Sequence, residues 1–422
     1  MGLILFIASY FISYSMAHTS LFLIFSLLTS ILFSLAGLTN AIFAKKFDDV
    51  TLNAKTLRVN DAELAAASKS VTGKLRTAIR LAHRNITQFH KRGLRKGWSD
   101  RNAQGARVAE KYDPFGRVGI YIPGGTAPLM STALMTVTLA KVAGCKEIVV
   151  CTLCGRDGKV NSGLLHAAKL AGATEIYRVG GAHAIAAMAH GTKSVAPVQK
   201  IFGPGNAYVV AAKRLLVGRV SIDLLPGPSE VLVLADGTAN PAFAAADILA
   251  QAEHGSGHER CWLVSTSAKF IGSVEKEIAK QLPQRSRRDY IKKALAKNGW
   301  LIQVSSRAKA IELANRLAPE HCEVMLKDAA AAAKHITTAG ALFLGNFSPT
   351  VTGDYVAGPS HTLPTGGAGA SFPGLTVDMF QRRTSVVQFT PAALKKSIAA
   401  IEQFAGVEGL DAHGRSASIR LD

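Results

Sequence analysis

Cysteine is scarce in this sequence, and only five cysteines are spread over 422 residues. An odd number of cysteines in a chain of this length is not the pattern of a disulfide framework, so a reducing compartment is expected. Cys151 and Cys154 have the spacing of a redox motif, but they follow a buried-strand run and no second pair completes a zinc site. A redox role for this pair is therefore disfavoured.

Acidic residues are also few, since 29 Asp and Glu stand against 49 Lys and Arg, for a net charge of +20. Such an excess can indicate nucleic acid, a membrane surface or anionic ligands. The basic residues are scattered, however, and their densest run, residues 285–297, is typical of the solvent face of a helix. Without a basic platform interleaved with aromatics, a nucleic-acid partner is not expected.

Charged residues are absent from positions 1–44. Residues 21–44 are long enough to cross a bilayer, which takes about 20 apolar residues. Lys45 and Lys46 follow, and the positive-inside tendency would keep the rest of the chain in the cytoplasm. The shorter run 2–17 lacks the basic start of a signal peptide. A membrane tether, a signal-like segment and a translation start further downstream all stay open, and the expected location is cytoplasmic.

A glycine-rich dinucleotide fingerprint of the usual form is missing. From residue 118 onward, however, short β runs alternate with helical runs, which predicts βαβ units and parallel sheets. Gly144 and Gly172 are placed as helix-ending residues, and Asn240 with Pro241 begins an alanine-rich helix. The predicted fold class is α/β, with two Rossmann-like domains and small helical segments at both ends.

Two sets of βαβ units meet near residue 230, which predicts a cleft with ligands at the carboxyl ends of the strands. Glu320 and His321 sit side by side after the helix breaker Pro319, and they are either a solvated loop or a general acid/base pair. Gln251 and His254 lie three residues apart in the last predicted helical turn, where they either face water or ligate a metal.

Two further loops concentrate polar residues. Asp354 and His361 lie in a stretch too rich in glycine and proline for regular structure, and Glu408 and His413 lie near the carboxyl terminus. An Asp, two His and a Gln from three segments could close a nitrogen and oxygen site suited to Zn²⁺ or Mn²⁺.

These motifs together resemble the histidinol dehydrogenase family. The resemblance is carried, in the family's order from about residue 48 to 422, by RVGIYIPGGTAPL, KIFGPGNAYV, PGPSEVLV, QAEHG, APEHCE, GDYVAGPSHTLPTGG and EGLDAH. It implies a zinc-dependent four-electron oxidation of L-histidinol to L-histidine through L-histidinal, with two NAD⁺, at the end of histidine biosynthesis.

The resemblance also implies roles for individual residues. Glu320 and His321 would be the acid/base pair. One Zn²⁺ per subunit would be held by Gln251, His254, Asp354 and His413. The substrate would be contacted by these four ligands together with His321, Ser229, His361 and Glu408.

For NAD, the resemblance implies contacts from Tyr121 and Asn206, and from His183, which stands where the family usually has glutamine. Histidine is shorter and titrates, so weaker and pH-dependent cofactor binding is expected. No metal ligand or acid/base residue is replaced, and an active enzyme is therefore expected.

The resemblance implies a homodimer with shared active sites and the following division of the chain. A leader or membrane segment covers 1–44, the first α/β domain covers 45–120 and 230–375, the second domain on the NAD side covers 121–229, and a dimer-contributing segment covers 376–422.

Three rival functions remain at this stage. A related zinc- and NAD-dependent dehydrogenase could act on another small amino or sulfonated polyol, although Glu408 and the turn GGTAPL favour histidinol. A catalytically inactive, membrane-tethered binding protein is suggested only by residues 1–44. A nucleic-acid binder is suggested only by the net charge, and it would show salt-sensitive binding to any duplex.

Overall fold

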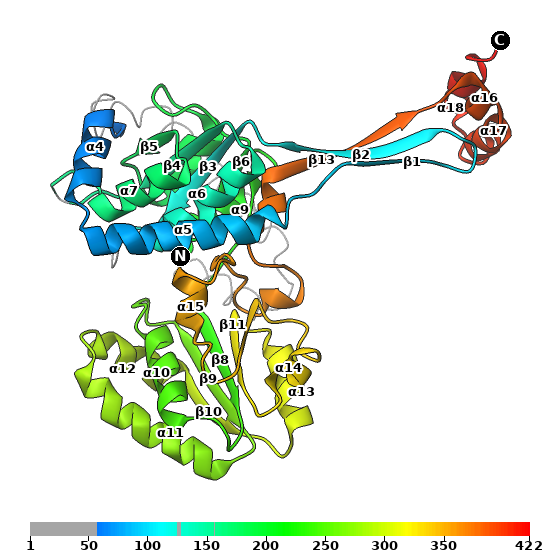
Figure 1. Ribbon diagram of the computed structural model, residues 1–422. Coiled ribbons are helices and arrows are strands. Elements are labelled where there is room, and N and C mark those ends of the chain that lie inside the picture. Colours follow the sequence, from blue (N-terminus) through cyan, green and yellow to red (C-terminus); the bar gives the residue numbers. More distant parts are fainter. Residues whose placement is uncertain (1–56, 125–127, 156) are drawn as a thin grey trace, which may run out of the picture.

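The computed structural model describes residues 57–124, 128–155 and 157–422. Two α/β domains lie one above the other, and a long arm leaves the upper one (Figure 1). Residues 1–56, which hold the hydrophobic segments within 1–44, and residue 156, together with residues 125–127 of the expected GGTAPL motif, fall outside the described residues. Among the residues described, no helix is both long and apolar enough to cross a membrane.

The domain expected on the NAD side, called the first domain from here on because its strands come first in the chain, contains a parallel five-stranded sheet in the order β5-β4-β3-β6-β7. Its strands are β3 (Arg117–Ile122), β4 (Glu147–Thr152), β5 (Glu175–Tyr177), β6 (Lys200–Phe202) and β7 (Ser221–Ile222). Its helices are α4 (Asp61–Ser70), α5 (Gly73–Lys91), α6 (Met130–Ala143), α7 (Ser162–Ala171), α8 (Gly181–His190) and α9 (Ala207–Leu216). One apolar cluster on each face of the sheet joins it to these helices.

The second domain repeats this plan with the parallel order β10-β9-β8-β11-β12. Its strands are β8 (Glu230–Ala235), β9 (Arg260–Ser265), β10 (Gly299–Gln303), β11 (His321–Met325) and β12 (Ala341–Leu344). Its helices are α10 (Pro241–Ala252), α11 (Ala268–Gln281), η1 (Leu282–Gln284), α12 (Arg288–Asn298), α13 (Arg307–Leu317), α14 (Ala329–Ala333) and α15 (Thr350–Tyr355). The predicted fold class, two α/β domains with parallel sheets, is confirmed.

The arm is a three-stranded antiparallel sheet in the order β1-β2-β13. Its strands are β1 (Trp98–Arg101), β2 (Arg107–Pro114) and β13 (Gln381–Gln388), and the turns η2 (Ala368–Ala370) and η3 (Val377–Phe380) precede β13. Its far end carries α16 (Pro391–Lys395), α17 (Ile398–Val407) and α18 (Asp411–Ser418), close to the carboxyl terminus (Figure 1). The helix expected near 391–404 is thus two helices.

The expected grouping of residues 45–120 with 230–375 differs from the structure. Helices α4 and α5 pack on α6 and α7 of the first domain, and Ile79 and Ile86 join the cluster that contains Val118 and Leu139. Residues 98–114 form arm strands instead. The helical pattern of α5 predicts an apolar face but not which domain that face packs on, and this explains the wrong grouping.

Helix ends follow the local rules of the sequence. Gly144 and Gly172 end α6 and α7 in the left-handed conformation, with φ of 91° and 112°. The Asn240 side chain accepts a hydrogen bond from the Ala242 amide, with Pro241 as the first helical residue of α10. These positions were correctly predicted because caps depend on neighbours in the chain.

Ile86→Ala should lower the free energy of unfolding by about 2–5 kcal/mol, because Ile86 on α5 is fully buried in the cluster that α5 shares with α6 and α7. Leu81→Ala on the same helix is the control, since Leu81 is 42% exposed. Urea unfolding of both variants measures the difference. Equal losses in the two variants would contradict the packing of α5 on α6 and α7.

Candidate active site

Glu320 and His321 are buried, with 6% and 3% of their surface exposed, so the solvated-loop alternative is excluded. Helix α13 ends at Leu317, and Ala318 turns the chain with a φ of 44°. Pro319 follows, and β11 begins at His321 itself. The pair therefore sits at the start of a central strand.

Two donors hold the Glu320 carboxylate. The Ser229 hydroxyl donates to Oε2 at 2.5 Å, and the Glu230 amide donates to the same oxygen at 2.8 Å. Burial raises the pKa of Glu320, while neighbouring His321 and the two hydrogen bonds act in the opposite direction. The carboxyl group is thereby held in one orientation and takes up a proton more readily than an exposed glutamate does.

The His321 ring is oriented by its Nδ1, which lies 2.9 Å from the Glu230 carbonyl oxygen. The N–H must be on this nitrogen to donate to a carbonyl, so Nε2 carries the lone pair. Nε2 faces Asp354, with Oδ1 at 3.7 Å. The hydrogen bond at Nδ1 thus fixes the ring so that Nε2 is the nitrogen that can accept a proton.

Gln251 and His254 meet at the end of α10. Gln251 lies in the last turn, whereas His254 lies beyond the helix end at Ala252, so its expected place in the last turn is wrong. The chain turns there, and His254 Nδ1 lies 3.0 Å from the Gln251 carbonyl oxygen. Gln251 is 3% exposed, and its Nε2 is buried without a hydrogen-bond partner.

Asp354 and His361 lie where the two domains meet, since His361 contacts both Asp354 and Thr132 of the first domain. Asp354 lies on the short helix α15, although its glycine-rich surroundings predicted no regular structure. His361 Nδ1 lies 3.1 Å from the Asp354 carbonyl oxygen, and the Thr132 hydroxyl of α6 lies 3.2 Å from Nε2. Burial lowers the pKa of His361, and the charges of His321 and His254 lower it further against the effect of Asp354. The site's histidines therefore lie close enough to influence one another.

The acid/base residues lie at the amino ends of their strands, which contradicts the expectation of carboxyl ends for this domain. Ser229 precedes β8, and His321 begins the neighbouring β11. The chain passes from the end of β7 at Ile222 to the start of β8 at Glu230. This connection brings the amino edge of the second sheet to the carboxyl edge of the first.

The three residues expected at NAD lie along that carboxyl edge. Tyr121 is 2% exposed, and its hydroxyl accepts a hydrogen bond from the Gly181 amide at 3.1 Å, where α8 begins. His183 is exposed in the first turn of α8. Asn206 caps α9 through its side-chain oxygen, which leaves its amide NH₂ as the group that can face a ligand. Strands β3 and β6 flank the point where the strand order reverses.

Glu408 and His413 are not brought to the other site residues. Glu408 ends α17, and His413 lies on α18, both exposed on the far end of the arm (Figure 1). Accordingly, no cluster of three or more His, Cys, Asp or Glu in the described part of the chain is arranged to hold a metal. Of the four residues expected to ligate a metal, three lie on the second domain and His413 lies on the arm.

Asp247 and Glu323 form a buried carboxyl pair beneath the site. Asp247 on α10 is 6% exposed and Glu323 on β11 is 1% exposed. Burial raises the pKa of Asp247 to about 6 and that of Glu323 well above its usual range, and the carboxyl groups hydrogen-bond each other. Glu323 also accepts the Thr350 amide at 2.8 Å, which ties α15 to β11. A carboxylate in the otherwise apolar stretch of β11 was the available sequence signal.

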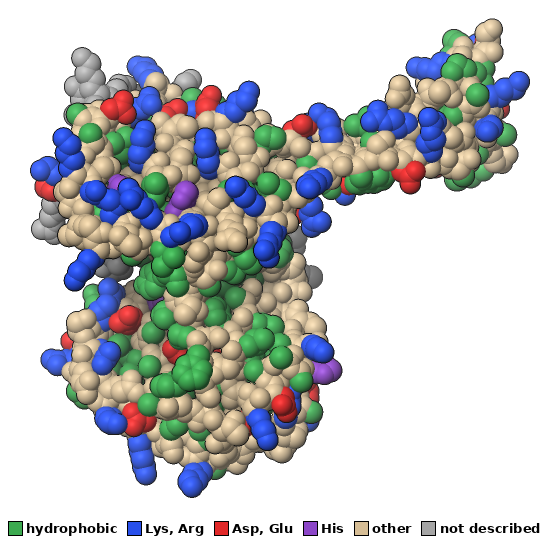
Figure 2. Space-filling model, in the orientation of Figure 1, with side chains coloured by type: hydrophobic (Ala, Val, Ile, Leu, Met, Phe, Trp, Pro, Cys, Tyr) green, Lys and Arg blue, Asp and Glu red, His purple; other side chains and the backbone are tan. Residues whose placement is uncertain are grey.

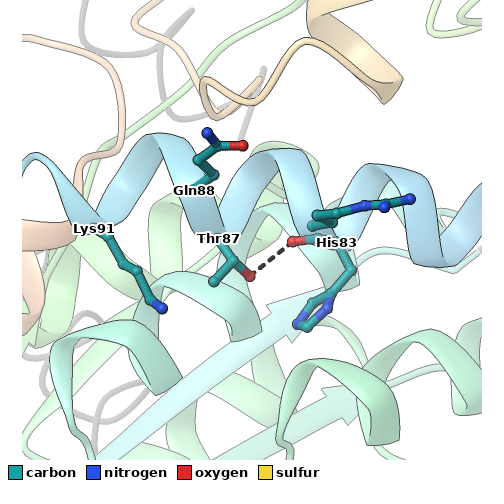
Figure 3. Close-up of a pocket in the computed structure, with 5 residues that line it drawn as sticks. His83, Thr87, Gln88 and Lys91 are labelled. Carbon is teal, nitrogen blue, oxygen red and sulfur yellow. Dashed lines mark hydrogen bonds between the residues drawn. The ribbon is translucent and has the colours of Figure 1, made fainter.

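A shallow surface depression lies on α5, and it shares no lining residue with the candidate active site. It is lined by His83, Arg84, Thr87, Gln88 and Lys91, and the Thr87 hydroxyl donates to the His83 carbonyl oxygen at 2.7 Å (Figure 3). None of the expected site residues lines it. It is therefore part of the helix surface and not of the candidate active site.

Comparison with known proteins places these residues in a family context. A family model described as histidinol dehydrogenase matches residues 39–421. Histidinol dehydrogenase of Synechococcus is 44% identical over 90% of this chain and 87% of its own length, and that of Bacteroides fragilis is 47% identical over 89% and 87%. The crystal structure of histidinol dehydrogenase from Elizabethkingia anophelis superimposes with a TM-score of 0.85 at 39% identity, covering 90% and 87%.

The Asp247–Glu323 pair predicts a pH-dependent stability. Both pKa values are raised in the folded state, so the folded chain binds more protons than the unfolded chain, and stability falls as pH rises through the raised values. Glu323→Gln keeps an oxygen for the Thr350 amide and supplies a permanent donor to Asp247. Its melting temperature should therefore fall less than that of the wild type between about pH 5 and about pH 8.

Glu275→Gln is the control for this measurement, since Glu275 is an exposed carboxylate on α11. Its pH profile should follow that of the wild type. A Glu323→Gln profile that also follows the wild type would show that the buried pair does not set the pH dependence.

Proposed function

Because the chain belongs to the histidinol dehydrogenase family, a family of oxidoreductases in histidine biosynthesis, we propose that it oxidises L-histidinol to L-histidine through L-histidinal in two NAD⁺-dependent steps. The buried Glu320–His321 pair, beside Asp354 of α15, is the observation that supports this most directly. The five cysteines are all unpaired, which suits a reducing cytoplasm.

His321 is the proposed base for the alcohol proton. Its Nδ1–H is used by the Glu230 carbonyl, so Nε2 is the nitrogen that can accept the proton. Removal of this proton lets the carbon–oxygen double bond form as the hydride leaves the same carbon. NAD⁺ supplies the hydride acceptor for each of the two steps.

Glu320 is the proposed base for the second step. Oxidation of an aldehyde by hydride loss requires its hydrate, so a water must first be deprotonated and added to the carbonyl carbon. A carboxyl group whose pKa is raised by burial is a stronger base than an ordinary carboxylate. The hydrogen bonds from Ser229 and Glu230 hold the carboxyl group while it takes this proton.

The donor set at the end of α10 fits a zinc ion. The His254 Nδ1–H is used by the Gln251 carbonyl, so Nε2 is the nitrogen that can ligate a metal, and the Gln251 amide is buried without a partner for its nitrogen. Asp354 adds a carboxylate from α15. Zinc held here, with His413 as fourth ligand, would act as a Lewis acid that orients the substrate.

A second copy of the chain is proposed to supply His413 and Glu408. Both residues lie on the arm and outside the cleft of their own chain. The end of the arm also exposes large apolar side chains, with Phe404 at 69% and Val407 at 79%, which suits a surface that is covered in a homodimer. His361 would contact the substrate from the cleft side.

Tyr121, His183 and Asn206 are proposed to contact NAD at the carboxyl edge of the first sheet. Tyr121 acts there by fixing the start of α8, whose first turn carries His183.

With added Zn²⁺, the full-length chain should form two NADH per L-histidinol, and His321→Asn should lower the rate about 100- to 10,000-fold because the base is removed. NADH absorbance measures both. His335→Asn, at an exposed histidine of the same domain, is the control and should keep the wild-type rate. A zinc-loaded, folded protein that forms no NADH would refute the proposed substrate.

Mixing two inactive variants tests the shared site. His321→Ala damages the cleft and His413→Ala damages the arm, so each homodimer lacks one essential residue in both sites. A mixed dimer keeps one intact site, and random exchange of equal amounts should restore about a quarter of the wild-type activity. Recovery that stays absent after exchange, with dimers verified by light scattering, would show that the arm does not complete the neighbouring site.

A further inference from the structure

The chain passes through a tight turn immediately after β6. Gly203 has a φ of 111°, and a Cβ atom at this position would lie 2.0 Å from the Tyr121 carbonyl oxygen. Only glycine therefore fits here, because the backbone after β6 closely approaches the backbone at the end of the neighbouring strand β3. The turn 203–206 borders the point where the strand order reverses, and it ends at Asn206, the cap of α9.

A fully buried ion pair holds this glycine by both of its backbone groups. The Lys213 ammonium and the Asp223 carboxylate pair with each other, and both side chains are 0% exposed. The ammonium also donates to the Gly203 carbonyl oxygen at 3.0 Å, and the carboxylate accepts the Gly203 amide at 2.7 Å. Every donor and acceptor of the Gly203 backbone is thus bound by one pair of opposite charges.

The pair connects three parts of the first domain. Lys213 belongs to α9, whose first turn is capped by Asn206. Asp223 follows β7, and its amide donates to the Ile201 carbonyl oxygen of β6 at 3.1 Å. The Lys213–Asp223 pair therefore fixes the position of the turn 203–206 relative to α9, and with it the position of Asn206.

Stability alone does not explain a buried ion pair, because apolar residues of similar volume often give equal or greater stability. Its distinctive feature is the pair of hydrogen bonds to a strained turn at the ligand edge of the sheet. We propose that Lys213 and Asp223 are positioning residues for NAD, which hold the turn 203–206 in the shape that receives the dinucleotide. This inference rests on the NAD site of the proposed function.

The test is the double variant Lys213→Met with Asp223→Leu, which removes both charges together and leaves no unpaired buried ion. Its Kd for NADH, measured by fluorescence titration, should rise at least about tenfold, which is about 1.4 kcal/mol. The KM for NAD⁺ should rise in parallel, whereas the KM for L-histidinol and the bound zinc should stay at wild-type values. A general loss of structure would change all four quantities.

A second ion pair in the same sheet gives the matched control. Arg117 at the start of β3 binds Glu175 at the start of β5 through two hydrogen bonds of 2.8 and 2.9 Å, at the opposite, amino edge. The double variant Arg117→Met with Glu175→Leu should leave the Kd for NADH unchanged, whatever it does to the melting temperature.

The outcomes separate this inference from the proposed function. Wild-type protein that binds NADH but does not oxidise L-histidinol would refute the proposed substrate and leave the binding test intact. An unchanged Kd for NADH in the folded Lys213/Asp223 double variant would overturn the inference, as would an equal weakening in the Arg117/Glu175 control. If circular dichroism shows the double variant unfolded, Asp223→Asn is measured instead, and wild-type NADH affinity in that variant would likewise overturn it.

Discussion

The chain leaves the carboxyl end of β7 at Ile222 and enters the amino end of β8 at Glu230, so opposite edges of the two sheets face each other. The placement of Ser229, Glu320 and His321 opposite the first domain depends on this crossing. The first sheet offers the turns after its strands, as in other doubly wound folds. The second sheet offers the starts of its strands, where a buried acid/base pair is held by the backbone of its neighbour strand.

Polar contacts across the junction keep the two edges in register. The Asn85 amide of α5 donates to the Val356 carbonyl oxygen at 2.8 Å, and the Thr132 hydroxyl contacts His361 at 3.2 Å. The surface of Figure 2 shows apolar side chains gathered where the domains meet, with charged side chains spread over the outer faces. On the face shown, the positive charge is therefore spread over solvent-facing surface and is not collected in one basic groove.

Burial is the common cause of the unusual chemistry here. It raises the pKa values of Glu320, Asp247 and Glu323. In the other domain the Lys213–Asp223 pair is fully buried, and it hydrogen-bonds both backbone groups of Gly203. In each case a charge is kept inside the protein only because hydrogen bonds and an opposite or neutral partner compensate for the lost water.

Local chemistry allowed part of this to be predicted from the sequence. Glycine at the ends of α6 and α7, the Asn240 cap and the strand–helix rhythm depend on neighbouring residues, and they were predicted correctly together with the fold class. The pairing of Glu320 with His321 was visible because the two are adjacent. What only the tertiary structure decided are the relations between distant residues. The packing of α5 on α6 and α7, the amino-edge position of His321 and the location of His413 on the arm arise from contacts that no spacing in the chain encodes, because packing and crossing direction depend on the whole fold.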